Sequence, residues 1–339
     1  MEQATPSQPL LDVDALTVHF RARGGLVHAV NEVSFQLAQG ETLALVGESG
    51  SGKSTTGLAI MGLLPADRGT MVRGAIRLTT KSGSVKDLLG LTQGQRRRVR
   101  GNDVAMIFQD PMSSLNPIYS IGSQIVEAVR QHRQVAARSA VAEALRLLAE
   151  LGIPNPDRIL ASYPHQLSGG MRQRVMIAIA LSCRPRVLIA DEPTTALDVT
   201  IQAQILALLK RLQKETAMAV VFITHNLGVV AEVTDRIVVM YAGRVVEMGP
   251  VREVFKSPRM PYTQALLRSL PRLDDLQRAR EPLEAIPGNV PSPLALPRGC
   301  SFHPRCRHRM GGICDDHIPR LEACAPDRLV RCARWREVA

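Results

Sequence analysis

The segment from Gly47 to Ser54, with the sequence GESGSGKS, constrains the fold more than any other part of the chain. Its three glycines allow a tight turn in which successive backbone N–H groups point inward and form a nest for an anion. A short apolar run (41–46) precedes it and a predicted helix (54–64) follows, and the positive end of that helix attracts the same anion. Strand, loop and helix in this order are the setting that a phosphate-binding loop requires. A glycine-rich turn with a chance Lys-Ser pair is the alternative, and eight matching positions disfavour it.

A second motif supplies carboxylates. The apolar stretch 187–190 predicts a buried strand that delivers Asp191 and Glu192 to the end of a sheet. In such sites a lysine like Lys53 reaches the β- and γ-phosphates, while Ser54 and Asp191 hold Mg²⁺. Glu192 is placed to polarise the attacking water as a general base. The two motifs together predict an α/β protein with a P-loop NTPase (RecA-like) core that hydrolyses ATP with Mg²⁺.

A serine and two glycines, Ser168, Gly169 and Gly170, open a predicted helix between those motifs. They form a second helix N-terminus able to bind an anion. One nucleotide does not need two such loops, unless the second one serves the nucleotide of another subunit. Taken alone, an ordinary Ser N-cap followed by glycines at the helix entry is the simpler interpretation.

With the phosphate loop before it and the Asp-Glu strand after it, this Ser-Gly-Gly segment resembles the signature of ABC transporter ATPases. Gln109, in the sequence FQDP, matches the family's glutamine that senses Mg²⁺ and the attacking water and faces the membrane subunit. Asp198, which ends an Ala-Leu-Asp sequence, matches the loop that crosses the dimer interface, and His225 matches the switch histidine that contacts the γ-phosphate. The adenine-stacking aromatic falls at Phe20, with His19 as the alternative.

The resemblance implies that two ATPase subunits dimerise head to tail, with ATP held between the phosphate loop of one and the Ser-Gly-Gly loop of the other. This chain is then expected to supply a full catalytic half-site. The implied catalytic residues are Glu192, His225 and Gln109. The implied Mg²⁺ ligands are Ser54, Gln109 and Asp191. The implied nucleotide-binding residues are Gly47, Glu48, Ser49, Gly50, Ser51, Gly52, Lys53, Ser54, Thr55, Phe20, Ser168, Gly169, Gly170 and Asp198.

The pattern of elements predicts how the chain is divided. Residues 11–20 and 29–37 are predicted strands, and the resemblance implies that they belong to an antiparallel β subdomain. Residues of about 91–165 are helical in character, and the resemblance implies that they form the helical signature subdomain. These belong to an ATPase domain over 1–258. Beyond it Pro and Arg become frequent and periodicity fades, which predicts a small Cys-rich C-terminal domain over 259–339.

Longer stretches narrow the resemblance to the dipeptide/oligopeptide (peptide/nickel) importer branch. They are FQDPMSSLNP at 108–117, YPHQLSGGMRQR at 163–174, DEPTTALDVT at 191–200 and PYTQALL at 261–267. The implied partners are two transmembrane permease subunits, a second ATPase subunit, and an extracytoplasmic solute-binding protein that binds the cargo. The second ATPase subunit is either a homologous chain, which the resemblance favours, or a second copy of this one. The branch also handles nickel, glutathione and other solutes, so these stay alternative cargoes. An exporter ATPase is disfavoured by the 261–267 stretch.

Charge and composition exclude other classes. The net charge is +11, which favours polyanionic surfaces, but aromatic residues make up only 3% of the chain, and base-stacking surfaces need them. We therefore expect no nucleic-acid partner; a soluble ABC ATPase acting on nucleic acid also needs a second cassette or a coiled-coil insertion, and neither is evident. No run of about 18 apolar residues predicts a membrane span, and the polar segment 1–11 predicts no signal peptide. We expect a peripheral protein on the cytoplasmic face of the inner membrane.

Five of the six cysteines gather near the C-terminus. In a cytoplasmic protein such a group favours metal binding over disulfides. The spacing of Cys300, Cys306, Cys314 and Cys332 matches a four-cysteine pattern that holds a [4Fe–4S] cluster in some members of the resembled branch. Zinc and unligated thiols stay open. Cys324 falls outside the pattern. The sixth, Cys183, is expected to be a small core residue.

Overall fold

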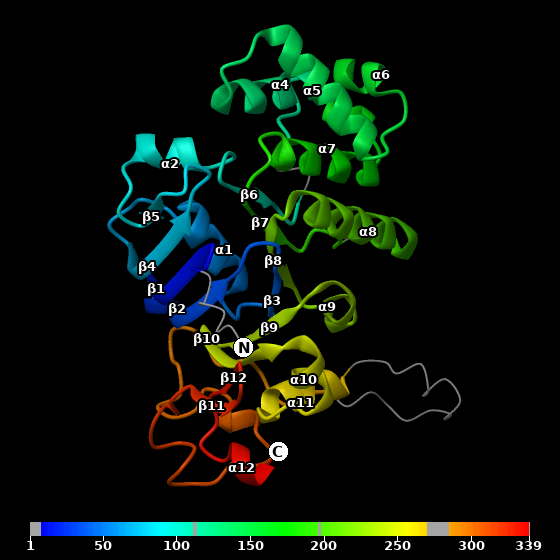
Figure 1. Cartoon of the computed structure of the whole chain (residues 1–339). Coiled ribbons are helices and arrows are strands. Elements are labelled where there is room, and N and C mark those ends of the chain that lie inside the picture. The colour runs from blue at the N-terminus through cyan, green and yellow to red at the C-terminus, as the bar shows by residue number, and fades with distance from the viewer. Residues whose placement is uncertain (1–7, 111–113, 196–197, 270–284, 339) are drawn as a thin grey trace, which may run out of the picture. The chain divides into compact units, whose positions relative to one another are not determined.

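The computed structural model describes residues 8–110, 114–195, 198–269 and 285–338 (Figure 1). The chain divides into two compact units. The first unit comprises Met1–Asp12, Gln36–Glu41 and Ile76–Phe222, and the second comprises Val13–Phe35, Thr42–Ala75 and Ile223–Ala339. Strands β1 (Leu11–Ala22), β2 (Gly25–Leu37), β4 (Thr70–Thr79) and β8 (Ala219–Thr224) contribute residues to both units.

The first unit is built on strands in the order β8–β7–β6. β6 (Val104–Ile107) and β7 (Val187–Asp191) are parallel, with Val104 opposite Val187 and Ile107 opposite Ala190. Every residue of both strands is buried, as expected for parallel strands covered on both faces. β5 (Val85–Asp87) pairs antiparallel with the end of β4.

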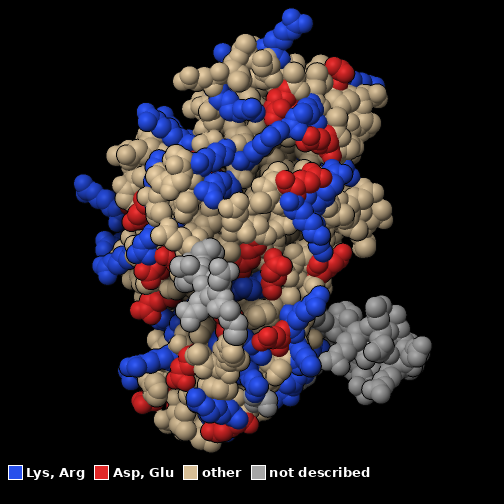
Figure 2. All heavy atoms as spheres, in the orientation of Figure 1, with Lys and Arg blue, Asp and Glu red and all other residues tan. Residues whose placement is uncertain are grey.

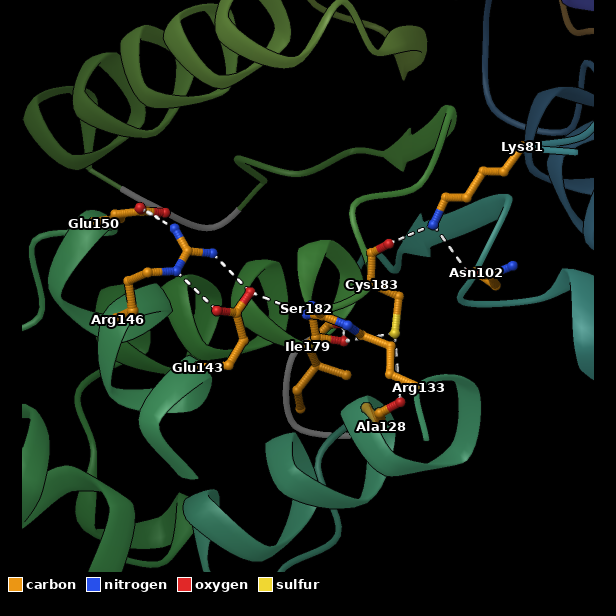
Figure 3. Close-up of polar contacts among 10 residues, drawn as sticks. All are labelled: Lys81, Asn102, Ala128, Arg133, Glu143, Arg146, Glu150, Ile179, Ser182 and Cys183. Atoms are coloured by element: carbon orange, nitrogen blue, oxygen red, sulfur yellow. Dashed lines mark hydrogen bonds and ion pairs between the residues drawn. The ribbon is translucent and has the colours of Figure 1, made fainter. Parts of the chain in front are cut away.

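Several helices of this unit lie in the stretch of about 91–165 that was predicted to be helical, and α7 begins at the predicted Ser-Gly-Gly segment. They are α2 (Gln93–Val99), α4 (Ile121–His132), α5 (Ala137–Glu150), α6 (Pro156–Ala161), the 3₁₀ turn η1 (Pro164–Gln166), α7 (Gly169–Leu181) and α8 (Val199–Thr216). α4, α5 and α6 pack on one another, and α4 and α5 also pack on α7. Figure 3 shows the polar contacts around these helices, including an arginine, Arg146, that donates to Glu143 at 2.8 and 2.9 Å and also bonds Glu150.

One part of the predicted helical segment 91–165 is a strand, β6. Its four apolar residues are too few to show a periodicity, and a short apolar run is consistent with a helix or with a buried strand. Asp103 directly precedes β6, and its carboxylate accepts a hydrogen bond from the Lys81 backbone N–H at 2.7 Å. The Lys81 ammonium donates to the Cys183 carbonyl at 2.6 Å (Figure 3). Cys183 itself is buried, as predicted.

The second unit has a sheet in the order β11–β12–β10–β9–β3. β3 (Thr42–Val46) runs parallel to β9 (Arg236–Tyr241), and β10 (Arg244–Pro250) is antiparallel to β9. The other elements that lie wholly in this unit are α1 (Lys53–Met61), α9 (Leu227–Val233), α10 (Val251–Lys256), α11 (Pro261–Arg268), the 3₁₀ turn η3 (His303–Arg305), β11 (Glu322–Ala325), β12 (Arg328–Val330) and α12 (Trp335–Val338).

The structure does not support a separate Cys-rich C-terminal domain. β12 joins the edge of β10, with Val330 opposite Glu247 and Leu329 opposite Met248. Tyr262, Phe302 and Val330 also share a hydrophobic core with residues of β3 and β9. The C-terminal residues of the described chain therefore extend an existing sheet and core, a long-range pairing that composition alone does not reveal.

No described helix is long and apolar enough to cross a membrane. In Figure 2, Lys and Arg side chains on the visible face are interspersed with Asp and Glu rather than gathered into one basic patch. This face therefore carries no single basic patch.

Candidate functional site

The phosphate loop lies between β3 and α1 in the second unit, as predicted. Gly52 is the residue before α1 and has a φ of 97°. A Cβ at Gly52 would lie 2.4 Å from the Ala29 carbonyl oxygen, and a Cβ at Gly47 (φ 149°) would lie 2.1 Å from that of Met240. Only glycine fits where the backbone approaches this closely. The two glycines thus fix the path of the loop.

Lys53 folds back into the loop. Its ammonium donates to the carbonyl oxygens of Gly47 at 2.7 Å and Glu48 at 2.9 Å, and to Ser51 Oγ at 3.3 Å. The residue is only 6% exposed. A buried ammonium held by several oxygens is a fixed positive charge, which suits it to bind an anion. Ser54 is exposed at the start of α1 and Thr55 is half-buried.

The carboxylate motif lies in the first unit, where β7 ends. Asp191 is its last residue and is 6% exposed. Glu192 follows with a φ of 47°, a left-handed conformation that is uncommon for a residue other than glycine. Backbone strain of this kind is concentrated at functional sites.

Two side chains orient the Glu192 carboxylate. Gln109 Nε2 donates to Glu192 Oε2 at 2.9 Å, and Thr195 Oγ1 donates to the same oxygen at 2.9 Å. The structure therefore brings together the predicted glutamine and the predicted general base. Gln109 directly follows the half-buried Phe108 at the end of β6, and because β6 and β7 are parallel, their carboxyl ends lie at the same edge of the sheet.

Gln173 supports this arrangement from α7. It is 2% exposed, and its Nε2 donates to the Pro193 carbonyl at 2.6 Å. The contact ties the helix that begins at the Ser-Gly-Gly segment to the turn that follows Glu192.

Two other predicted residues are helix N-caps in the first unit. Ser168 Oγ accepts the Met171 N–H at 3.4 Å at the start of α7, and Asp198 Oδ1 accepts the Ile201 N–H at 2.9 Å at the start of α8. Gly169 and Gly170 form the first turn of α7. Within this chain Ser168 therefore acts as an ordinary helix N-cap. The side chains of Ser168 and Asp198 are both exposed. Residues 196 and 197 of the Ala-Leu-Asp sequence, and 111–113 after Gln109, lie outside the described residues.

The remaining predicted nucleotide contacts lie in the second unit. His225 is exposed, between the end of β8 and the start of α9. Phe20 is half-buried on β1. His19, the alternative candidate for stacking on the adenine, already makes other contacts. Its Nε2 lies 3.1 Å from Asn31 Oδ1 and 3.1 Å from His28 Nδ1. These contacts favour Phe20 as the ring available for stacking.

The cysteine cluster does not fit the predicted [4Fe–4S] group. Cys300, Cys306, Cys314 and Cys332 do line one cavity, but its volume is about 20 Å³, room for about one water molecule. Among the residues of the described ranges, no group of three or more His, Cys, Asp or Glu side chains could hold a metal ion. Burial raises the pKa of Cys300 and of Cys332 to about 11. The iron–sulfur prediction is therefore not supported.

Sequence reasoning missed four side chains that support the site. Thr195 and Gln173 lie beside the Glu192 turn, and Tyr262 and Arg305 contact Glu48 of the phosphate loop. Thr195 was within reach of sequence analysis, since it follows Glu192 by three residues. No sequence pattern could have indicated Arg305, because 257 residues separate it from Glu48, the residue it contacts.

The comparisons with known proteins agree with this geometry. Residues 30–195 match the family model described as ABC transporter, and residues 246–314 match the one described as oligopeptide/dipeptide transporter, C-terminal region. A protein of Brucella abortus is 53% identical over 98% of this chain and 99% of its own length. The dipeptide transport ATP-binding protein DppD of Haemophilus influenzae is 51% identical over 95% of this chain and 94% of its own length.

A solved structure is also similar. It is the dimeric structure of a post-hydrolysis state of the ATP-binding cassette MJ0796 bound to ADP and Pi, with a TM-score of 0.61 and 26% sequence identity. The match covers 71% of this chain and 99% of that one. It confirms the predicted α/β cassette fold.

The chain belongs to the ABC transporter family and is one of its ATP-hydrolysing cassettes. Within that family it carries the C-terminal region that marks the oligopeptide/dipeptide transporters, as the longer motifs predicted.

Proposed function

We propose that this chain is the ATP-binding subunit of an importer and that its ATP hydrolysis drives the uptake of di- or oligopeptides. The observation that carries the cargo class is the match of residues 246–314 to the oligopeptide/dipeptide transporter C-terminal region. The names of the relatives support it, since they include a dipeptide transport protein, DppD, and an oligopeptide transport protein, AppD of Bacillus subtilis.

The site residues take the following roles in this proposal. The loop 47–55 binds the phosphates, with Lys53 as its fixed positive charge, and Phe20 stacks on the adenine. Glu192, oriented by Gln109 and Thr195, accepts a proton from the attacking water, and His225 contacts the γ-phosphate.

Mg²⁺ supplies positive charge to the β- and γ-phosphates when bound. The residues that would hold it are Ser54, Gln109 and Asp191. Hydroxyl, amide and carboxylate oxygens are the hard ligands that this ion prefers, so the donor set fits.

The exposed N-caps Ser168 and Asp198 serve a second cassette. We propose that this cassette is a homologous ATPase subunit and that its nucleotide meets Ser168, Gly169 and Gly170. Two transmembrane permease subunits and an extracytoplasmic solute-binding protein complete the system. The chain is then peripheral, on the cytoplasmic face of the inner membrane.

Glutathione is a second candidate cargo. The glutathione import ATP-binding protein GsiA of Salmonella choleraesuis is 55% identical over 79% of this chain, although the match covers only 43% of that protein. Uptake of labelled dipeptide, tetrapeptide and glutathione by vesicles that contain the assembled transporter separates these cargoes. Uptake of glutathione alone would contradict the peptide proposal.

The catalytic assignment is tested by Glu192→Gln in the full-length chain. We expect ATP binding to persist and turnover to fall by a factor of about 10² or more, since the amide cannot accept the proton. Glu215→Gln is the matched control: its carboxylate is 60% exposed on α8, where it faces Arg211 at 3.8 Å, and the variant should hydrolyse ATP like the wild type. Undiminished turnover in Glu192→Gln would remove this residue from its role.

A further inference from the structure

The second residue of the phosphate loop is held by a side chain from the C-terminal region. Arg305 Nη1 donates to Glu48 Oε2 at 2.6 Å, and Arg305 Nη2 donates to Glu48 Oε1 at 3.0 Å. Two parallel bonds of this kind match the planar guanidinium to the planar carboxylate and give both strength and a defined orientation. Both residues belong to the second unit.

Arg305 is itself fixed in place. Its Nε donates to the Pro287 carbonyl at 3.0 Å, its Nη2 to the Ile286 carbonyl at 3.3 Å, and its Nη1 to the Tyr241 hydroxyl at 3.2 Å. With the two bonds to the carboxylate, these contacts match all five N–H donors of a guanidinium. The residue is 8% exposed. The positive charge is therefore presented to the loop by a rigid support.

Glu48 is held at its backbone as well. Its N–H donates to the Tyr262 hydroxyl at 2.9 Å, and its carbonyl accepts the Lys53 ammonium at 2.9 Å. Tyr262 is fully buried and packs on Tyr241 and Phe302, with ring centroids 4.6 and 5.3 Å away. The C-terminal region thus contacts the loop through a hydroxyl and a guanidinium, each locked by its surroundings.

We propose that Arg305 is a positioning residue for ATP binding: it neutralises the Glu48 carboxylate and fixes the start of the phosphate loop. A loop that binds phosphates gains nothing from a carboxylate of its own, since like charges repel. Without the guanidinium, that carboxylate would repel the nucleotide and would compete with the phosphates for the Lys53 ammonium. The proposal rests on the proposed ATP-binding function and adds a residue to it.

The same unit offers a control of matched chemistry. Arg328 is 4% exposed and donates to the fully buried Glu247, with Nη2 3.1 Å from Oε1. Its Nη2 also donates to the Ser257 carbonyl at 2.7 Å. Arg328→Met therefore breaks a second buried ion pair of the same unit, one that joins β12 to β10 and includes no residue of the phosphate loop. It separates loss of stability from loss of loop positioning.

The experiment measures the Kd of the full-length chain for ATP with Mg²⁺, together with thermal unfolding, for wild type, Arg305→Met, Arg328→Met and the double variant Arg305→Met/Glu48→Gln. We expect Arg305→Met to weaken binding about tenfold, by an amount that shrinks at high salt. Arg328→Met should unfold at a lower temperature and keep the wild-type Kd. The double variant should recover most of the affinity, because the uncompensated charge is gone.

Three results would overturn the proposal: a folded Arg305→Met chain with wild-type Kd, a double variant no better than Arg305→Met, or an equal loss of affinity in Arg328→Met. If Arg305→Met does not fold, Arg305→Lys tests the positioning role instead. It keeps the charge but loses the two-bond geometry, and we expect about threefold weaker binding, whereas wild-type affinity would refute the positioning role. A wild-type chain that binds no ATP, with Lys53→Met no different from it, would instead contradict the proposed function.

Discussion

The Glu247 carboxylate gives the sharpest prediction about stability. It is fully buried and accepts three hydrogen bonds: from the backbone N–H of Arg259 at 2.8 Å, from that of Met260 at 3.0 Å, and from Arg328 Nη2 at 3.1 Å. One side chain on β10 thus holds β12 and the chain segment that enters α11. In Glu247→Gln the amide can still accept, but its NH₂ group faces donors and the buried guanidinium loses its counter-charge.

Removing one partner of a buried ion pair costs about 3–5 kcal/mol. Because the amide keeps the shape and part of the hydrogen bonding, we expect about 3 kcal/mol for Glu247→Gln, which lowers the melting temperature by about 6–12 °C for a unit of this size. Chemical and thermal denaturation of the full-length chain measure both quantities. Arg328→Met should cost a similar amount.

The double variant is the critical measurement. Replacing both partners of a buried pair is often nearly neutral, because no uncompensated charge is left. We therefore expect Glu247→Gln/Arg328→Met to be destabilised by clearly less than the sum of the single variants. Additive losses would show that the two side chains act independently, and the reasoning would fail.

Three further predictions follow from buried polar groups. Tyr262→Phe leaves the second amide of the phosphate loop without its acceptor, and the Kd for ATP should rise severalfold without loss of fold; an unchanged Kd would refute this. Gln173→Leu leaves the Pro193 carbonyl unpaired, so the rate of ATP hydrolysis should fall while ATP binding persists, as single-turnover kinetics would measure. Burial raises the pKa of Cys300 and Cys332 to about 11 from 9.0, so the stability linked to these protonated thiols is fully present below pH 9 and is lost as pH rises through 11; unfolding at increasing pH measures the decline, which should be smaller in the double serine variant.

Sequence analysis predicted the parts of this protein that depend on local pattern. The phosphate loop, the strand that ends at Asp191, the helical stretch that contains α5 and the helix α7 follow from glycine spacing and from local apolar pattern. The contact between Gln109 and Glu192 was accessible only through the family resemblance, since 83 residues separate them.

What sequence analysis missed depends on long-range pairing. β6 is recognisable only once it lies beside β7, because four apolar residues carry no periodicity. The C-terminal region looked like a separate domain because its Pro and Arg content obscures the strand β12. The ion pair of Arg305 with Glu48 joins residues 257 positions apart in the sequence, and no local sequence rule predicts a contact over that separation.

The pairing of β12 with β10 has a practical consequence for shortened versions of this chain. β10 has a buried, largely apolar sequence, and its outer edge is covered by a strand of only three residues, with β11 beyond it. A chain cut before Arg328 would leave the backbone N–H and C=O groups along that edge open to strands of other molecules, which is a common route to aggregation. Insolubility of a truncated cassette would then reflect an uncovered sheet edge.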